Sequence, residues 1–505
     1  MPGVKKKHLV VISAVSIVAV VTLAAYFTVL SPTNDFELEI NDIDPMDLSV
    51  DEYMEDFQAL YDFVEENYPF VDVKNRTHGY NWLDLKSHFE SQILNAQSNQ
   101  DFFNIISSAI MALQNRHTHI YPPSWVQRDT TQFADLEDFR LNDIFTQEVS
   151  DAQDYWNAIY SEWSDATYYK RFVDLIVYEK GEYIVQNQAN LVVTHVNGDP
   201  IDDAVMSCYE HDQIDYDFER EKNYVWSIYP RTFGDDAVFT VQNSTGHQTD
   251  MNFDVIDGWA YNPYSYPGTP FNTTVLEGKN IGYLYAGTFG SNADAYGEQV
   301  LEFYEQIEDF DHLIIDIRGN TGGFYTKWIN GIVQPLIHDQ VLHEQFFAYK
   351  TGEYVSQTQS YILDTIVPKD EFSYLPPEVY EDDYRIHKNW MTYEPMGEFD
   401  FNGDIVLLVD NMVYSAAEGF ATFCKEFDFA TIYGTPTGGD GIILRPLNFV
   451  LPNSKLMINA ASAIGLDYTG NANEEVRTQP DVYYESEFGN WNELINYVIA
   501  DLTNA

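Results

Sequence analysis

Hydrophobic positions at helical spacing dominate the first folded part of the chain. The segments LSVDEYMEDFQALYDFVEENYPF and DFFNIISSAIMALQNRH repeat apolar residues every three to four positions, which predicts a small helical domain over residues 48–130. That periodicity fades near residue 120. Residues 121 to about 170 are rich in Tyr, Trp and Asp without a clear period, so we expect a loop-rich connection there.

The pattern changes to strands over residues 171–256. NLVVTHVNGDPIDDAV combines a β-branched run, an Asn-Gly pair and a helical start, and AVFTVQNSTGHQTDMNFDV has the form of a hairpin. Asn-Gly between short apolar runs favours a tight turn between antiparallel strands. These residues therefore predict a small β-rich module.

From residue 270 onward, strand-like and helical segments alternate. NIGYLYAGTF, HLIIDIRGN, DIVLLVD and FATIYG are apolar runs of strand length, and GEQVLEFYEQIEDF and AAEGFATFCKEF have helical spacing. This order is typical of an α/β domain with a largely parallel sheet. We expect such a domain over residues 270–490.

An uncharged apolar run near the N-terminus predicts export. Lys5, Lys6 and Lys7 precede residues 9–30, which carry no charge and are long enough to cross a bilayer as a helix of about 20 residues. The apolar part of a secretory signal is usually shorter, about 7 to 15 residues, so the run favours an uncleaved signal anchor within residues 1–30. A cleaved signal is the alternative, and both place the folded part outside the cytoplasm.

The net charge and the cysteine content limit the kinds of partner and metal site that the protein can have. The net charge is −54, with 80 acidic against 26 basic residues, which disfavours nucleic acid because a polyanion needs a Lys/Arg surface to displace its counterions. The acidic residues are spread along the chain and indicate a solvated surface. Cys208 and Cys424 allow one disulfide but lack zinc-site spacing. The sequence leaves the oligomeric state open.

Two strand ends in the predicted α/β domain carry candidate chemistry, since open α/β sheets place ligands there. HLIIDIRGNTGG ends in Gly322 and Gly323, and a glycine lets a backbone N–H approach a substrate carbonyl closely. MVYSAAEGFATF places Ser415 at a helix start, where the N–H of Ala416 is available to an oxyanion. Ser415 followed by Glu418 is also a capping-box pattern, so Ser415 is either a nucleophile or a helix cap.

Several motifs in a fixed order resemble the C-terminal processing, or tail-specific, serine peptidases, and within them the branch of the tricorn protease catalytic core. The motifs are ENYPF, QNRHTH, VNGDPIDD, IGYLYAGTF, IIDIRGNTGG, VYSAAEGFA, IYGTPTGG, LPNSKL and NEEVRTQPDV. The resemblance implies a crotonase/ClpP-like α/β catalytic core. It also implies that residues 171–256 form a PDZ-like module beside the N-terminal helical domain.

The resemblance assigns catalytic roles to residues of this chain. Ser415 matches the nucleophile, His117 the general base of the tricorn-like branch, and Glu474 the glutamate that completes the charge system. Gly322 or Gly323, with Ala416, matches the oxyanion-binding amides. Asp440 stands where many relatives carry a catalytic lysine, which excludes a Ser-Lys dyad at this position. No metal or organic cofactor is implied.

Three departures from the family pattern bear on the site. Arg116 replaces a small residue beside His117, and its charge is expected to lower the histidine pKa. His119 lies two residues away as a second candidate base. Arg477 and Thr478 replace the Gly-Val of the C-terminal signature.

The sequence thus predicts an exported, membrane-anchored serine endopeptidase that acts on peptide or protein substrates, with tail-specific processing as one form of that activity. PDZ-like modules capture extended peptides at a sheet edge, and the acidic surface favours basic or neutral peptides over acidic ones. The alternatives are a catalytically inactive ligand- or peptide-binding protein on the same scaffold and a surface adhesion protein.

Overall fold

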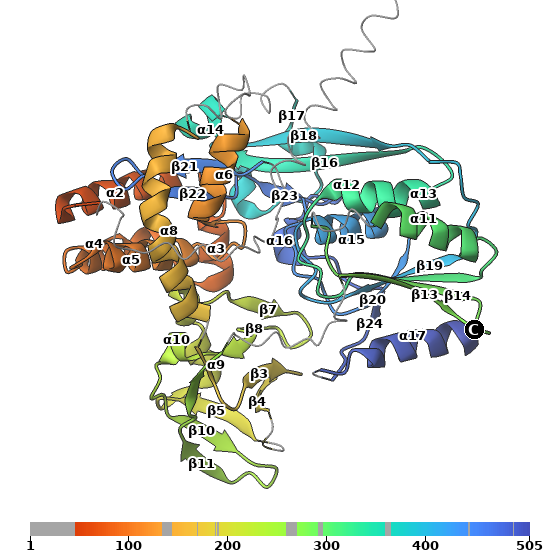
Figure 1. Ribbon diagram of the computed structural model, residues 1–505, viewed down its shortest axis with the longest axis horizontal. Coiled ribbons are helices and arrows are strands. Elements are labelled where there is room, and N and C mark those ends of the chain that lie inside the picture. The colour runs from red at the N-terminus through yellow and green to blue at the C-terminus, as the bar shows by residue number, and fades with distance from the viewer. Residues whose placement is uncertain are drawn as a thin grey trace, which may run out of the picture.

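The chain folds around one mixed sheet with smaller sheets and a helical region beside it (Figure 1). The computed structural model describes residues 46–133, 144–168, 170–186, 188, 191–258, 270–290, 296–358, 365–442, 445–487 and 489–504. The anchor predicted at residues 9–30 lies outside this part of the chain. Within the ranges just given, no helix combines the length and apolarity needed to span a membrane.

The central sheet has six strands in the order β13-β14-β15-β19-β20-β24. Only β13 runs antiparallel to its neighbour, and the other pairs are parallel. The strands are β13 (Phe271–Leu276), β14 (Ile281–Ala286), β15 (His312–Asp316), β19 (Asp404–Val409), β20 (Thr431–Gly434) and β24 (Val482–Tyr483). The carboxyl ends of the parallel strands therefore meet along one edge, where ligand sites of such sheets form.

Helices cover both faces of this sheet (Figure 1). On one face Leu313 and Leu407 pack with Phe420 of α15, and on the other Leu408 packs with Leu494 of α17. Burial on both faces explains why these strands are continuous apolar runs. The covering helices are α11 (Tyr296–Ile307), α12 (Tyr325–Trp328), α13 (Gln334–Leu336) and α15 (Ala416–Glu426) on the first face, and α17 (Asn492–Asn504) on the second.

Two antiparallel sheets join the central sheet to the helical region. One has the order β17-β18-β16-β23 and the other β1-β22-β21. In the second sheet His119 of β1 pairs with Asn459 of β22, which holds the end of the helical region against the C-terminal part of the chain. The strands are β1 (His119–Ile120), β16 (Val341–Lys350), β17 (Ile366–Val367), β18 (Tyr384–Tyr393), β21 (Leu447–Val450), β22 (Met457–Ala460) and β23 (Ile464–Leu466).

The N-terminal region is helical over a longer stretch than its periodicity indicates. It contains α2 (Val50–Asn67), α3 (Val71–His78), α4 (Lys86–Ile93), α5 (Asn99–Met111), α6 (Pro123–Phe133) and α8 (Gln147–Tyr168). The predicted loop-rich connection is therefore wrong. Trp156 of α8 is fully buried, stacks against Phe103 and donates its indole N–H to the carbonyl of Ser454 at 2.7 Å. Tertiary packing holds this helix where its own pattern is weak.

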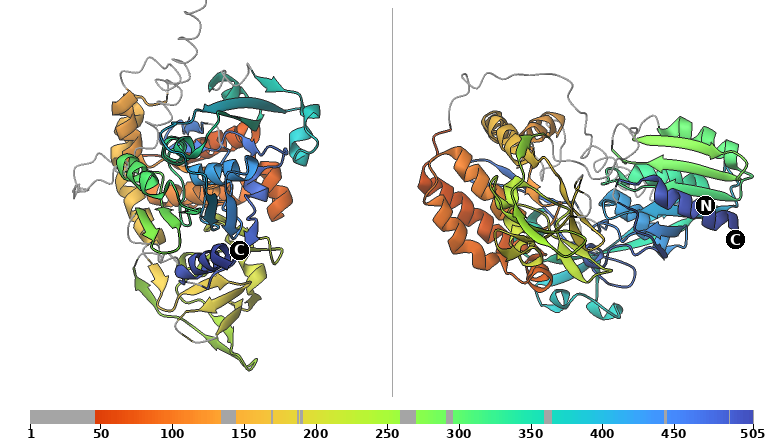
Figure 2. Two further views of the ribbon diagram at one scale, coloured as in Figure 1. Left: turned by 90° about the vertical axis from the view of Figure 1, so that its right-hand side faces the viewer. Right: turned by 90° about the horizontal axis from the view of Figure 1, so that it is seen from below.

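The β-rich module projects from the rest of the molecule (Figure 2). Its main sheet follows the order β11-β10-β5-β4-β3-β9, with β6 paired to β5. Asn197 and Gly198 both have positive φ, 53° and 92°, as a tight Asn-Gly turn requires, and β10 and β11 form the expected hairpin. The strands are β3 (Ile176–Glu179), β4 (Glu182–Val185), β5 (Val192–Val196), β6 (Asp199–Pro200), β9 (Ser227–Ile228), β10 (Phe239–Gln242) and β11 (Gln248–Met251).

Several short elements lie outside the main sheets and helices. Two strand pairs, β2 with β12 and β7 with β8, lie outside the main sheets. These strands are β2 (Lys170–Phe172), β7 (Asp215–Asp217), β8 (Lys222–Tyr224) and β12 (Val255–Asp257), and the remaining α-helices are α9 (Ile201–Val205), α10 (Pro230–Phe233), α14 (Glu353–Thr358) and α16 (Asn473–Val476).

The two cysteines do not form the disulfide that the sequence allowed. Cys208 and Cys424 are both buried and free. They lie in different cores, Cys208 in the β-rich module and Cys424 beneath the central sheet. Two separate hydrophobic cores keep the sulfur atoms apart.

Candidate active site

Ser415 lies between the end of β19 and the start of α15. Its backbone has φ 56° and ψ −126°, and its side chain makes no capping hydrogen bond. Outside turns, a non-glycine residue with positive φ is held there by its surroundings, and such residues are common at active sites. Glu418, the other half of the capping-box pattern, instead binds Asn473 and Thr478. The helix-cap alternative is therefore not what the structure shows.

His117 reaches Ser415 from the loop between α5 and β1. Its Nε2 lies 3.0 Å from Ser415 Oγ, within the range expected of a nucleophile and its base. Asn459 Nδ2 donates to the His117 carbonyl at 3.1 Å, so β22 helps to hold this loop. The two residues are 298 positions apart in sequence.

Asp440 occupies the other side of the His117 ring. Asp440 Oδ2 lies 2.8 Å from His117 Nδ1, and the carboxylate is almost fully buried. Burial alone would raise the pKa of Asp440, but attraction to His117 and hydrogen bonds from His117, Asn115 and Tyr414 outweigh it, and the pKa lies below its ordinary value. A carboxylate accepting the Nδ1 proton fixes the tautomer in which Nε2 accepts from serine.

Asn115 and Tyr414 complete the support of the Asp440 carboxylate. Asn115 Nδ2 donates to Asp440 Oδ2 at 3.0 Å, and the Tyr414 hydroxyl donates to the same oxygen at 3.0 Å. The Tyr414 ring also stacks on His117 at 4.8 Å between centroids. These contacts restrict both the carboxylate and the imidazole.

Glu474, expected to complete the charge system, bonds to Lys74 and Asn115. Its Oε1 lies 2.6 Å from Lys74 Nζ and 3.4 Å from Asn115 Nδ2. Burial is the main cause of its raised pKa, which Lys74 opposes and the nearby Asp440 charge reinforces. Glu474 forms no hydrogen bond with His117, because Asp440 is bonded to Nδ1 and Lys74 holds the Glu474 carboxylate.

The paired glycines lie against the serine. A Cβ on Gly322 would come within 2.8 Å of Ser415 Cβ and 2.9 Å of Ala416 N, so only glycine fits there. The Gly322 N–H donates to Asn320 Oδ1 at 2.9 Å. The N–H groups of Gly323 and Ala416 form no hydrogen bond with any described residue. Gly323 and Ala416 are thus better placed than Gly322 to offer donors to an oxyanion.

Arg116 is paired with an acidic residue, and His119 does not bond to Ser415. Arg116 Nη2 lies 2.6 Å from Asp215 Oδ2, and Arg477 Nη2 lies 3.0 Å from Asp215 Oδ1. Asp215 of β7 therefore neutralises the cation that was expected to act on His117. His119 makes no hydrogen bond to Ser415, and burial lowers its pKa to about 4, helped by repulsion from His117.

Sequence reasoning did not identify Asp440 and Asn115 as functional candidates. Asp440 was noted only as the residue in place of a lysine, and Asn115 stands two positions before His117. A signal for Asp440 was present: it follows β20, the strand next to β19 and Ser415. Neighbouring parallel strands bring their following loops together.

Residues 280–484 match the model of peptidase family S41. That range contains Ser415, Asp440 and both glycines, whereas His117 comes from outside it. The match over residues 280–484 confirms the resemblance drawn from the motifs and the expected class, a serine-type peptidase of family S41.

Two solved structures of CPAF share this fold. Mature CPAF has a TM-score of 0.52 at 11% identity, covering 90% of this chain and 98% of that chain. Mature CPAF complexed with lactacystin has a TM-score of 0.51 at 11% identity, covering 90% of this chain and 99% of that chain. A putative peptidase from Parabacteroides merdae scores 0.46 at 14% identity, covering 89% and 96%. The predicted α/β fold class with an N-terminal helical region and β-rich modules is confirmed.

No curated protein matches the chain significantly.

Proposed function

We propose that the protein is a serine endopeptidase in which Ser415, His117 and Asp440 form the catalytic triad. The observation that carries this proposal is the continuous chain of contacts from Ser415 Oγ to His117 Nε2 at 3.0 Å and from His117 Nδ1 to Asp440 Oδ2 at 2.8 Å. A serine hydroxyl is a weak nucleophile until a positioned base accepts its proton.

Acylation begins when Ser415 Oγ attacks the scissile carbonyl carbon and its proton passes to His117 Nε2. Asp440 stabilises the resulting imidazolium without taking its proton. The N–H groups of Gly323 and Ala416 donate to the negative oxygen of the tetrahedral intermediate. Collapse breaks the C–N bond, and the leaving amine takes the proton from His117.

Deacylation repeats the sequence with water. His117 removes a proton from water as its oxygen attacks the acyl-enzyme ester, and the same amides hold the second oxyanion. The C–O bond to Ser415 then breaks, and His117 returns its proton to Ser415 Oγ. The products are a carboxylate and the free enzyme, so the chemistry needs no other group.

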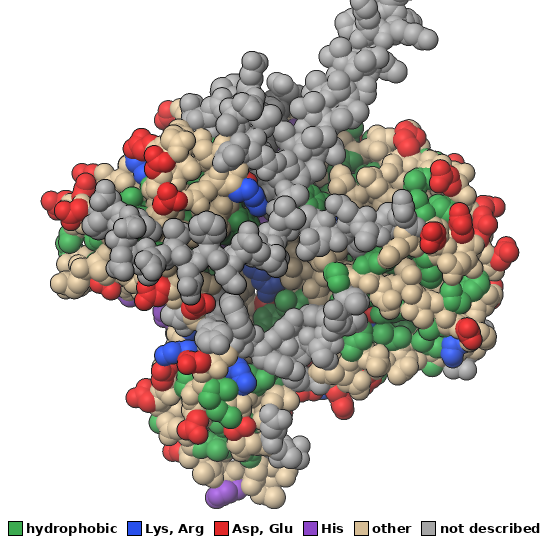
Figure 3. Space-filling model, viewed as in Figure 1, with side chains coloured by type: hydrophobic (Ala, Val, Ile, Leu, Met, Phe, Trp, Pro, Cys, Tyr) green, Lys and Arg blue, Asp and Glu red, His purple; other side chains and the backbone are tan. Residues whose placement is uncertain are grey.

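We also propose that the protein is exported and anchored by residues 9–30, with the catalytic region outside the cytoplasm. The uncharged run after Lys5, Lys6 and Lys7 supports this location. Acidic side chains spread over the surface (Figure 3) suit a solvated exterior. Capture of peptide tails by residues 171–256 belongs to the same proposal and rests on the PDZ-like pattern.

Hydrolysis of an unstructured protein tests the function directly. The full-length protein in detergent should cleave casein, and His117→Ala should lower kcat by several orders of magnitude, as loss of a triad member does. His119→Ala serves as the matched control and should stay within about tenfold of the parent, because His119 makes no contact with Ser415. Equal losses in both variants would contradict the assignment of His117.

A further inference from the structure

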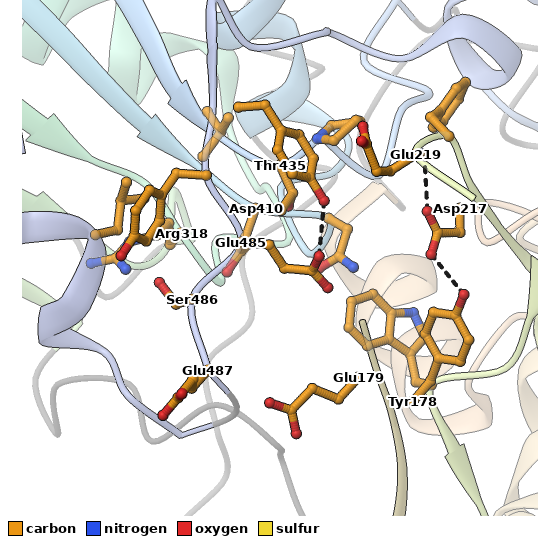
Figure 4. Close-up of a pocket in the computed structure, with 18 of the residues that line it drawn as sticks. Tyr178, Glu179, Asp217, Glu219, Arg318, Asp410, Thr435, Glu485, Ser486 and Glu487 are labelled. Atoms are coloured by element: carbon orange, nitrogen blue, oxygen red, sulfur yellow. Dashed lines mark hydrogen bonds between the residues drawn. The ribbon is translucent and has the colours of Figure 1, made fainter. Parts of the chain in front are cut away.

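A cavity lies between the β-rich module and the central sheet, and neither Ser415 nor His117 lines it. It is open to solvent and is lined by β3, the β7–β8 pair, the loops after β19 and β20, and residues 483–487 and 489–491. Figure 4 shows side chains from these elements converging on one space.

Asp410 lies at the inner wall of this cavity and is only 8% exposed. Its Oδ1 accepts from the N–H groups of Gly319 and Met412, each at 3.0 Å. Its Oδ2 accepts no hydrogen bond from any described residue. Burial raises the pKa of Asp410 to about 6, although the two backbone hydrogen bonds act to lower it. At neutral pH a buried charge that is costly to maintain therefore faces the cavity.

The balance of charge in the cavity is negative. Its lining includes six acidic and three basic residues, and each arginine is already paired. Arg220 binds Asp217 and Glu485; Arg318 binds Asp316; Arg477 binds Asp215. Glu219, Glu487 and Asp410 form no ion pair within the described part of the chain.

Aromatic rings form much of the remaining wall. Tyr178 stacks on Tyr224 at 4.2 Å, and Trp226 packs edge-on against Tyr224. Protein cations already lie over three lining rings. Lys222 Nζ is 5.5 Å from Tyr178, and the guanidinium carbons of Arg318 and Arg477 are 3.8 Å from Trp491 and 5.6 Å from Phe218. Aromatic faces beside carboxylates attract cations and cover their apolar stems.

We infer that this cavity binds a lysine or arginine side chain of the peptide substrate, with Asp410 as the inner carboxylate and Glu219 and Glu487 near the mouth. This inference rests on the proposed peptidase function for its occupant. Within the described residues, no group of His, Cys, Asp and Glu suits a metal ion. The aromatic walls favour an organic cation with an apolar stem.

The cavity is close enough to the nucleophile to select substrates. Ser415 follows Asp410 by five steps along the chain, which span at most about 18 Å when fully extended. An extended peptide covers about 3.3 Å per residue. The bound basic residue therefore lies within roughly five positions of the scissile bond.

Binding to the inactive enzyme separates this inference from the proposed catalysis. The full-length Ser415→Ala protein in detergent is titrated with a series of fluorescein-labelled decapeptides. Each peptide consists of Gly, Ala and Ser with a single lysine, and the position of the lysine differs from peptide to peptide. In the control peptides norleucine replaces the lysine at each position, which keeps the apolar stem and removes the charge. Fluorescence anisotropy should show at least tenfold tighter binding of lysine or arginine over norleucine at one or two positions.

Neutralising the cavity should remove that preference. Asp410→Asn keeps the Oδ1 acceptor for Gly319 and Met412 and should reduce the lysine-to-norleucine ratio to below threefold. Glu219→Gln combined with Glu487→Gln, at two exposed positions, should reduce it in part and provides a test if the Asp410 variant fails to fold. Asp404→Asn, at the opposite end of β19 with its side chain 85% exposed, is the matched control and should leave the ratio unchanged.

The results distinguish the two claims. Equal binding of lysine and norleucine peptides at every position, or an unchanged preference in Asp410→Asn, would overturn the cationic pocket even if casein is cleaved. A lysine preference that depends on Asp410 would support the pocket even if casein hydrolysis fails.

Discussion

One hydrogen bond, from His117 Nδ1 to Asp440 Oδ2 at 2.8 Å, determines which carboxylate serves the base. Glu474 is a second buried carboxylate close by, yet it pairs with Lys74. Because a triad acid acts by holding the histidine tautomer, the residue that touches Nδ1 should dominate. This choice can be tested with two conservative substitutions.

Asp440→Asn should lower kcat by about 10³- to 10⁴-fold, because an amide at Nδ1 stabilises the wrong tautomer. Glu474→Gln should cost far less, about tenfold or below, since its carboxylate does not touch the ring. Steady-state hydrolysis of a fluorogenic peptide measures both. A larger loss in Glu474→Gln than in Asp440→Asn would return the role to Glu474.

Sequence reasoning reached Ser415 and His117 because each lies in a motif with a local signature. Asp440 was missed as the partner of His117 because that role depends on loop geometry. Its backbone has φ 53°, and the neighbouring Gly439 forms a bridge with Tyr414 of the serine loop. Contacts between loops of neighbouring strands are not encoded in either loop alone.

Glu418, on the first turn of α15, should make stability depend on pH. Burial raises its pKa to about 7, against hydrogen bonds from Asn473 and Thr478. A carboxyl with a raised folded pKa releases its proton more readily when unfolded, so the free energy of unfolding should fall as pH rises from about 4.5 to about 7. The shift corresponds to roughly 3 kcal/mol.

Glu418→Gln removes this titration. Urea unfolding at pH 5 and pH 8 should show a smaller loss of stability in the variant than in the parent, by up to about 3 kcal/mol. Glu302→Gln, on the exposed side of α11, is the control and should follow the parent. A variant that loses as much stability as the parent between these pH values would refute the assignment.

At the scale of elements, the strands of the central sheet were predictable because they are buried on both faces and read as continuous apolar runs. α8 was not predictable from its periodicity. Trp156 and Gln153 tie it to the loop before β22 through the carbonyls of Ser454 and Lys455. A helix fixed by such distant contacts carries only a weak local pattern.

The β7–β8 pair is held against the catalytic loops by Asp215, which binds Arg116 and Arg477. Burial alone would raise the pKa of Asp215, but the two arginines lower it below its ordinary value. Removing one partner of a buried ion pair leaves an uncompensated charge. This cluster therefore joins the β-rich module to the active site.

Asp215→Asn should reduce the free energy of unfolding by about 3 kcal/mol, because two partly buried arginines lose their counter-charge. Urea unfolding monitored by tryptophan fluorescence measures the loss. Asp235→Asn, whose partner Lys170 and own side chain are largely exposed, should cost less than about 1 kcal/mol. Similar losses in the two variants would show that the Asp215 cluster contributes little.

At the scale of the whole molecule, the active site joins regions far apart in sequence. His117 comes from the helical region, outside residues 280–484 that match family S41, and the β1–β22 pairing carries it to the serine. The family and fold class could be predicted from ordered motifs, whereas the meeting of these parts depends on the folded whole.

The predicted location concerns residues 9–30. The mature protein should retain its N-terminus and require detergent for extraction, because an apolar run of this length spans a bilayer and lacks a clear cleavage site. Added protease should reach the catalytic region on intact cells or protoplasts, while an N-terminal tag stays protected. A soluble protein in the medium whose sequence begins after residue 25 would refute the anchor and leave export intact.

Covalent labelling tests the central claim most directly. A fluorophosphonate probe should react once with the full-length protein in detergent, and peptide mapping should place the adduct on Ser415. In the proposed site His117 activates the Ser415 oxygen, and the Gly323 and Ala416 amides donate to the phosphoryl oxygen of the probe. Ser415→Ala should abolish labelling, while Ser356→Ala on α14 should leave it unchanged. Labelling that persists in Ser415→Ala, or an adduct mapped to another serine, would contradict the account.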